Sequence, residues 1–259
     1  MKFSTSKTEL QKALQKLSKA IPTRSTLPIL NSVFIKISKT EASLKSTDLE
    51  IAIETNIPVS VEEEGSVCIP LKTLLNITSE LPETRITIET DNKNKTIIIT
   101  DFGKYDLMGS AAEEFPEGIQ HSESHEMKIS LDMLKKIIER TLFAVSKDEL
   151  KPSLSGVCFE IEKNMIKAVS TDGHRLVKHV QKEAKTEGIT KTIIIPKKFL
   201  SFVLAQTGKE NINLSFGNST LKATQGKETI TTRLIDEVFP DYEVVIPKNN
   251  DKTLKINKN

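Results

Sequence analysis

Met127-Lys128-Ile129-Ser130 repeats the first four residues of the chain, Met1-Lys2-Phe3-Ser4, and this repetition decides the fold class. Four more segments return in the same order, 124 to 126 residues later. Coincidence in a chain rich in Lys and Ile explains five ordered matches poorly, so we infer two copies of one unit. The other matched pairs are 28–33 with 152–157, 45–48 with 169–172, 68–72 with 194–198, and 114–117 with 238–241.

The repeat predicts where the domains divide. The first domain is expected to span residues 1–122 and the second residues 123–252, with the boundary in the polar, loop-like stretch 118–126. Residues 254–257, Leu-Lys-Ile-Asn, resemble residues 127–130 once more. We therefore expect residues 253–259 to be the stub of a third, missing copy.

A short strand and then a helix are expected at the start of each copy. In the first copy, Leu10, Leu14 and Leu17 have the spacing of one helix face. Lys12 and Lys16 each lie two residues beyond one of these leucines, about 200° around the helix. The spacing predicts a basic stripe opposite the apolar one.

The second copy repeats this pattern with Leu134 and Ile138 on the apolar face and Lys136 and Arg140 opposite. A second short helix is expected after Pro70 and after Pro196 in the two copies, because Pro suits the first turn of a helix. These helices carry basic residues at matched positions, Lys72 in one copy and Lys197 and Lys198 in the other. A solvated face remains an equally good interpretation of such lysines.

The rest of each copy has strand character. Residues 49–54, 95–100 and 192–195 are rich in β-branched residues, and residues 91–94 and 217–219 carry hairpin-turn signals. Each copy therefore combines two helices with several mostly antiparallel strands. The fold class is α+β, a tandem repeat of domains with two helices on an antiparallel sheet.

Composition and charge narrow the class of protein. Hydrophobic residues make up 37% and charged residues 28%, and no apolar run or leader typical of export is present. The two cysteines, Cys68 and Cys158, fit buried thiols in a reducing cytoplasm. The net charge of +2 hides an asymmetry, since residues 1–125 hold 14 basic and 18 acidic side chains and residues 126–259 hold 23 and 17. Such asymmetry matters for anionic partners.

Signals for catalysis and for cofactors are poor. Residues 170–175, Ser-Thr-Asp-Gly-His-Arg, form the only dense polar cluster, and the matching segment of the first copy has no His. A structural turn is the favoured interpretation, a binding loop remains open, and hydrolysis by Asp172 and His174 is a remote alternative. His121 and His125 are four residues apart in a segment that does not predict a helix, so no metal is expected. We expect no enzyme activity and no cofactor.

Several motifs resemble those of the bacterial β sliding clamp, the processivity subunit of DNA polymerase III. They span the whole chain in order: Met1-Lys2-Phe3, residues 24–30 (RSTLPIL), 47–50 (TDLE), 171–176 (TDGHRL) and 239–242 (FPDY). The resemblance implies three such domains per subunit and a ring of two subunits around duplex DNA, with helices lining the hole. It implies that this chain holds the first two domains.

The resemblance also implies a DNA-binding surface. Basic residues on the helices, and others in the loops at residue 24 and at residues 146–153, are expected to meet phosphates without base readout. Asp148 stands where the family has a neutral amide, so neighbouring lysines are expected to replace that contact. The expected DNA-binding residues are Arg24, Lys12, Lys16, Lys72, Lys136, Arg140, Lys147, Lys151, Lys197 and Lys198.

A peptide-binding pocket is the second site that the resemblance implies, with the rest of the pocket in the third domain. Its expected partners are the replicative polymerase, the clamp loader, repair polymerases and other clamp-motif proteins. Val244 stands where some members have Arg, which makes the rim less basic. The alternative is that the apolar residues of this set belong only to the hydrophobic core. The expected lining is Leu154, Thr171, Gly173, His174, Arg175, Leu176, Pro240 and Val245.

Ring closure in the family joins an edge strand of the first domain to the partner's third domain. The matching segment here is residues 104–108, with Tyr105 and Leu107 on one face. Without a third domain we expect this chain to be monomeric or to associate differently from the family homodimer. An interaction scaffold without a DNA role remains the main alternative function.

Overall fold

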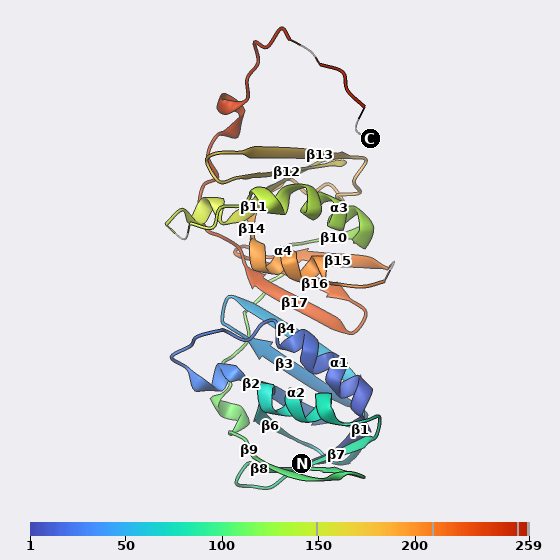
Figure 1. The fold of residues 1–259 in the computed structure, drawn as a ribbon. Coiled ribbons are helices and arrows are strands. Elements are labelled where there is room, and N and C mark those ends of the chain that lie inside the picture. The colour runs from blue at the N-terminus through green and yellow to red at the C-terminus, as the bar shows by residue number, and fades with distance from the viewer. Residues whose placement is uncertain (149, 209, 253, 258–259) are drawn as a thin grey trace.

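The computed structural model describes residues 1–148, 150–208, 210–252 and 254–257. The two repeats are stacked along one axis, and their four helices lie on the same face of the sheets (Figure 1). No helix in the described part of the chain has the length and apolar character needed to cross a membrane.

The first repeat runs from β1 to η2. Its helices are α1 (Lys7–Leu17) and α2 (Leu71–Glu80), with short 3₁₀ turns η1 (Pro28–Asn31) and η2 (Ala112–Glu114). Its strands are β1 (Lys2–Ser6), β2 (Ser32–Ser38), β3 (Glu41–Thr47), β4 (Ile51–Pro58), β5 (Ser60–Glu63), β6 (Gly65–Pro70), β7 (Arg85–Thr90), β8 (Lys95–Thr100) and β9 (Gly103–Met108).

The second repeat has the same order of helices and strands, except that no strand corresponds to β5. Its helices are α3 (Leu131–Thr141) and α4 (Lys197–Leu204), with 3₁₀ turns η3 (Leu142–Ala144), η4 (Pro152–Leu154) and η5 (Tyr242–Val245). Its strands are β10 (His125–Ser130), β11 (Gly156–Glu162), β12 (Met165–Thr171), β13 (Leu176–Lys182), β14 (Lys191–Pro196), β15 (Asn211–Phe216), β16 (Thr220–Gln225) and β17 (Glu228–Arg233).

The strands form three antiparallel sheets. Their orders are β5-β1-β7-β8-β9, β10-β15-β16-β17-β4-β3-β2-β6 and β13-β12-β11-β14. The eight-stranded sheet crosses from one repeat to the other, because β17 pairs with β4 and places Ile230 opposite Ile53. Both of these side chains are buried. The junction between the repeats is thus built from main-chain hydrogen bonds and a buried apolar pair.

Local sequence explains the matched helices. Ser6 and Ser130 precede α1 and α3, and each side chain accepts a hydrogen bond from a first-turn amide, which is the preferred role of Ser at a helix start. α2 and α4 begin directly after Pro70 and Pro196. The leucines predicted to form the apolar face of α1 are fully buried against the sheets. The two helices per repeat therefore lie where their spacing predicts.

Two boundaries differ from the prediction. β4 begins at Ile51 rather than at Leu49, because the Asp48 carboxylate captures the amides of Glu50 and Ile51 in a turn. β10 begins at His125, inside the stretch 118–126 that was expected to be loop, and pairs along its length with β15. Tertiary pairing makes a strand of a polar segment that has little strand propensity of its own.

Candidate functional site

Most of the basic residues expected on the helices are exposed. Lys12, Lys72, Lys136, Arg140 and Lys197 have exposed side chains on helices α1 to α4. These helices share one face of the molecule (Figure 1). Their charges therefore reach solvent on a single side of the two repeats.

Two members of the expected set form ion pairs across the junction. Lys16 of α1 pairs with Glu228 of β17, and Lys198 of α4 pairs with Asp48 in the turn before β4. Each pair joins one repeat to the other. Part of the positive charge of Lys16 and Lys198 is therefore neutralised within the chain, and both pairs link the two repeats.

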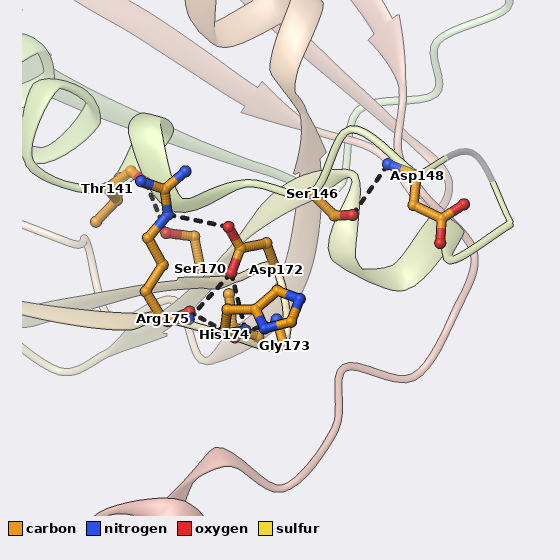
Figure 2. Close-up of polar contacts among 9 residues, drawn as sticks. Thr141, Ser146, Asp148, Ser170, Asp172, Gly173, His174 and Arg175 are labelled. Carbon is orange, nitrogen blue, oxygen red and sulfur yellow. Dashed lines mark hydrogen bonds and ion pairs between the residues drawn. The ribbon is translucent and has the colours of Figure 1, made fainter.

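The remaining residues expected to bind DNA lie in loops. Arg24 is exposed in the segment between α1 and η1, and Lys147 is exposed after η3. The Lys151 Nζ atom lies 4.0 Å from the Asp148 carboxylate, so its charge is partly compensated. Asp148 donates its backbone N–H to the Ser146 hydroxyl, as Figure 2 shows. The Asp148 carboxylate is exposed at the position where a neutral amide was expected from the resemblance.

Residues 170–175 form a tight turn between β12 and β13. The Ser170 hydroxyl donates to the carbonyl oxygen of Thr141 at the end of α3, at 2.6 Å. The Asp172 carboxylate accepts hydrogen bonds from the backbone amides of His174 and Arg175, both at 3.0 Å, and pairs with the Arg175 guanidinium at 2.9 Å (Figure 2). These contacts tie the turn to the helix.

The first repeat builds the same turn from residues 46–51. Ser46 donates to the carbonyl oxygen of Leu17 at the end of α1, and Asp48 accepts from the amides of Glu50 and Ile51. The backbone after each Asp has positive φ, 77° at Leu49 and 91° at Gly173. A leucine held in this conformation shows that the turn itself demands it, and Gly173 supplies it without steric cost.

The geometry removes the basis for an Asp172–His174 catalytic pair. The hydrogen bonds from Arg175 and His174 amides lower the pKa of Asp172 to about 2, and the carboxylate binds the backbone of His174 rather than its ring. The His174 side chain is exposed. Asp172 is thus a structural anion that shapes the turn.

All eight residues expected in the peptide pocket line one cavity of about 430 Å³. Its apolar members are only partly covered, since Leu154 and Leu176 are half-buried and Val245 is 64% exposed. Arg175 lies at the rim, with its guanidinium carbon 5.7 Å from the centroid of the exposed Phe143 ring. The cavity has apolar walls and a polar, basic edge.

Asp241 and Tyr242 also line this cavity, although neither was among the residues expected there. Both residues directly follow Pro240 in the sequence, and this adjacency was the signal that could have predicted them as lining residues. Tyr242 is buried and donates its hydroxyl to Glu160 at 2.9 Å; burial and this hydrogen bond raise the pKa of the phenol. The Tyr242 ring packs with Phe239 and with Cys158, and so fixes one wall of the pocket to the sheet.

Thiol reactivity and metal binding have no supporting geometry in the described part of the chain. Cys68 and Cys158 are buried, which raises the pKa of each thiol to about 12. Within residues 1–148, 150–208, 210–252 and 254–257, no three His, Cys, Asp or Glu side chains gather as metal ligands. His121 instead hydrogen-bonds Thr220 and Ser215, both at 2.8 Å.

Comparison with known families decides the identity. Residues 1–119 match the model of the DNA polymerase III beta subunit N-terminal domain, and residues 128–241 match that of its central domain. The beta sliding clamp of Pseudomonas putida is 30% identical over 97% of this chain and 70% of the relative. The beta sliding clamp of Bacillus subtilis is 30% identical over 99% and 71%. The chain belongs to the bacterial β sliding clamps.

Solved clamps have the same fold. The Bacillus subtilis sliding clamp superposes with a TM-score of 0.91 at 30% identity, over 96% of this chain and 68% of that one. The DNA polymerase III subunit beta of Pseudomonas aeruginosa gives 0.91 at 27% identity, over 97% and 69%. As a sliding clamp, the chain serves DNA replication as a processivity factor.

Among the strands that end a sheet in the described part of the chain are β9 and β13. β9 ends the five-stranded sheet and β13 ends the four-stranded sheet. On β9, Tyr105 and Leu107 are half-buried against the core, and Lys104, Asp106 and Met108 are exposed. The two residues expected at a subunit interface thus point to the same side of a strand that lies at the edge of its sheet.

Proposed function

We propose that helices α1 to α4 face duplex DNA inside a ring of six such domains. The observation that supports this most is the placement of all four helices on one face, with exposed basic residues repeated at matched positions. Lys12 and Lys136 are one such matched pair, and the exposed Arg140 matches Lys16, which is half-buried. Cytoplasmic location, where the chromosome lies, is part of the same proposal.

The expected contacts are weak and independent of base sequence. Lysine and arginine side chains bind phosphates as mobile charges, so contacts exchange readily as the protein moves along the duplex. Lys16 and Lys198 contribute less than their position suggests, because each already pairs with an acid of this chain. Arg24, Lys147 and Lys151 add contacts from the loops.

The 430 Å³ cavity beside β13 is proposed to bind short, partly apolar peptide segments of partner proteins. Apolar walls with a few polar groups suit an extended peptide. The replicative polymerase, the clamp loader and repair polymerases are the proposed partners. A solved Pseudomonas aeruginosa relative with a TM-score of 0.89 is bound to griselimycin, which makes this compound a suitable probe.

Charge reversal tests the DNA-facing surface. We expect Lys136→Glu with Arg140→Glu to weaken binding to a fluorescent duplex and to reduce the slope of log K against log salt by about two. Lys93→Glu with Lys163→Glu makes the same charge change in two hairpin turns and serves as the control. Equal losses in both double variants would show that binding follows net charge and not the helices.

Pocket variants test the second site. Leu176→Asp places a charge on an apolar wall and is expected to abolish griselimycin binding measured by calorimetry. Val180→Asp, on an exposed position of the same strand, is the matched control and is expected to bind normally. Normal binding by Leu176→Asp would place the site elsewhere.

A further inference from the structure

A cavity of about 340 Å³ lies at the junction of the two repeats and shares no lining residue with the peptide pocket. Thr231 of β17 and Ala52 of β4 pair across the junction and both line it. Phe34 and Phe115 add an aromatic wall, with their ring centroids 5.3 Å apart. The volume falls within the range of sites that bind small ligands.

The repeat explains why this space is open. Residues 115–118 (FPEG) match residues 239–242 (FPDY), so Gly118, which lines the cavity, is the counterpart of the buried Tyr242. A Cβ atom at Gly118 would have no neighbour within 4 Å, and the backbone there does not have positive φ. The first repeat therefore has room for a side chain at the position where the second repeat carries a tyrosine.

The surface that Tyr242 covers in the second repeat has its counterpart in this cavity. Tyr242 packs in one apolar cluster with Cys158 and Val169, which pair with each other across β11 and β12. Phe34 and Lys45 pair in the same way across β2 and β3, 124 residues earlier, and both line the cavity. The cavity thus lies over the positions that an aromatic ring covers in the second repeat.

The polar groups match as well. Tyr242 donates its hydroxyl to the Glu160 carboxylate at 2.9 Å, and the Lys167 Nζ atom lies 3.6 Å from the same carboxylate. In the cavity, the Lys45 Nζ atom lies 3.1 Å from the Glu54 carboxylate, and both residues belong to the lining. A phenol hydroxyl that enters the cavity would therefore meet a carboxylate whose charge a lysine already compensates.

We propose that this cavity binds the side chain of a tyrosine carried by a segment of a partner protein. A cavity of about 150 Å³ already holds benzene, so this one has room for a ring and for the main chain that carries it. Glu117 and Gly118 are exposed at the cavity, which gives such a segment access from solvent. The site goes beyond the proposed DNA-binding and peptide-pocket roles and depends on neither.

Ligand-observed ¹⁹F NMR with the 259-residue chain tests the site. The probe is N-acetyl-3-fluorotyrosinamide at slightly acidic pH, where the phenol is protonated, and N-acetyl-3-fluorophenylalaninamide is the same probe without the hydroxyl. We expect saturable line broadening, with about fivefold tighter binding of the tyrosine compound, because only its hydroxyl can donate to Glu54. Equal affinities of the two compounds, or no binding, would overturn the proposal.

Cavity-filling variants locate the binding. Gly118→Tyr supplies the ring that the second repeat has, and is expected to abolish probe binding and to raise the midpoint of thermal unfolding. Gly118→Ala is the matched control and is expected to bind the probe normally, because a methyl group meets open space there. Ala52→Phe fills the cavity from β4 and should also abolish binding. Normal binding by both filled variants would contradict the assignment.

Two further arms identify the source of the ring and the site. Free 2-fluoro-4-methylphenol has the same ring without a main chain and is expected to bind more weakly than the tyrosine compound. Binding of the free phenol alone would mean a small phenolic ligand and would overturn the proposed protein partner. Saturating griselimycin should leave the tyrosine signal unchanged, because the two cavities share no lining residue. Displacement by griselimycin would place the probe in the peptide pocket instead.

Discussion

Lys198 in α4 forms an ion pair with Asp48 in the turn before β4, across the junction between the two repeats. The Asp48 carboxylate also accepts two backbone amides of its own turn, so one side chain shapes the turn and receives the neighbouring domain. The Asp48 side chain is 12% exposed and that of Lys198 is 44% exposed. A residue that we propose to face DNA thus also links the two repeats.

The first prediction concerns the Lys198–Asp48 ion pair. A double-mutant cycle of Lys198→Ala and Asp48→Asn, followed by urea denaturation, is expected to give a coupling free energy of about 0.5–1 kcal/mol, the range of partly exposed ion pairs. Lys197→Ala removes the adjacent exposed lysine and should show no coupling to Asp48. A coupling energy of zero for Lys198 would mean that the pair is not formed in solution.

The second prediction concerns the serines that anchor the two turns. Ser170→Ala removes the hydroxyl that binds the carbonyl oxygen of Thr141, in a fully buried setting. An unsatisfied buried carbonyl costs about 1–3 kcal/mol, so the unfolding free energy should fall by that amount. Ser46→Ala removes the equivalent bond to Leu17 and should cost a similar amount. Wild-type stability in either variant would contradict the anchoring role.

The third prediction is a pH dependence of the turn formed by residues 170–175. The backbone amides of Arg175 and His174 lower the pKa of Asp172 to about 2. The stabilisation from this carboxylate is therefore complete above its unfolded pKa of about 3.9 and is lost as the pH falls toward 2. A carbon-detected NMR titration should place the midpoint near 2. A midpoint near the unfolded value would mean that the turn hydrogen bonds are absent.

The fourth prediction concerns the wall of the pocket. Tyr242→Phe removes the hydroxyl that binds Glu160 while keeping the ring in place. We expect a loss of about 1 kcal/mol in stability, with faster amide hydrogen exchange in residues 235–246. Glu160 retains Lys167 at 3.6 Å, which limits the cost. Unchanged exchange in this segment would show that apolar packing alone holds it.

Local sequence patterns predicted the helices and their basic faces. Leucine spacing placed the buried side of α1, and the repeat carried the same assignment to α3. Neither pattern encodes sheet order, because the pairing of β17 with β4 joins residues far apart in the chain. The ion pairs of Lys16 and Lys198 were missed for the same reason, since each partner lies in the other repeat.

The prediction of the pocket residues came from the family resemblance and not from the spacing of residues in the sequence. Nothing in the spacing of Leu154, Leu176 and Val245 distinguishes a pocket wall from core, and the structure brings them together through η4, β13 and η5. The burial of Tyr242 is a tertiary feature as well, since its hydroxyl reaches Glu160 on β11. The roles of these residues in binding stay predictions.

Site-specific photocross-linking to duplex DNA tests the central claim most directly. A photoreactive maleimide attached to Lys136→Cys probes the helical face, and the same label on Val238→Cys probes an exposed position outside the helices. The native thiols stay unlabelled because burial raises the pKa of each to about 12. DNA adducts from residue 136 and few from residue 238 are predicted. Equal adducts from both, or more from residue 238, would contradict a DNA-facing helical surface.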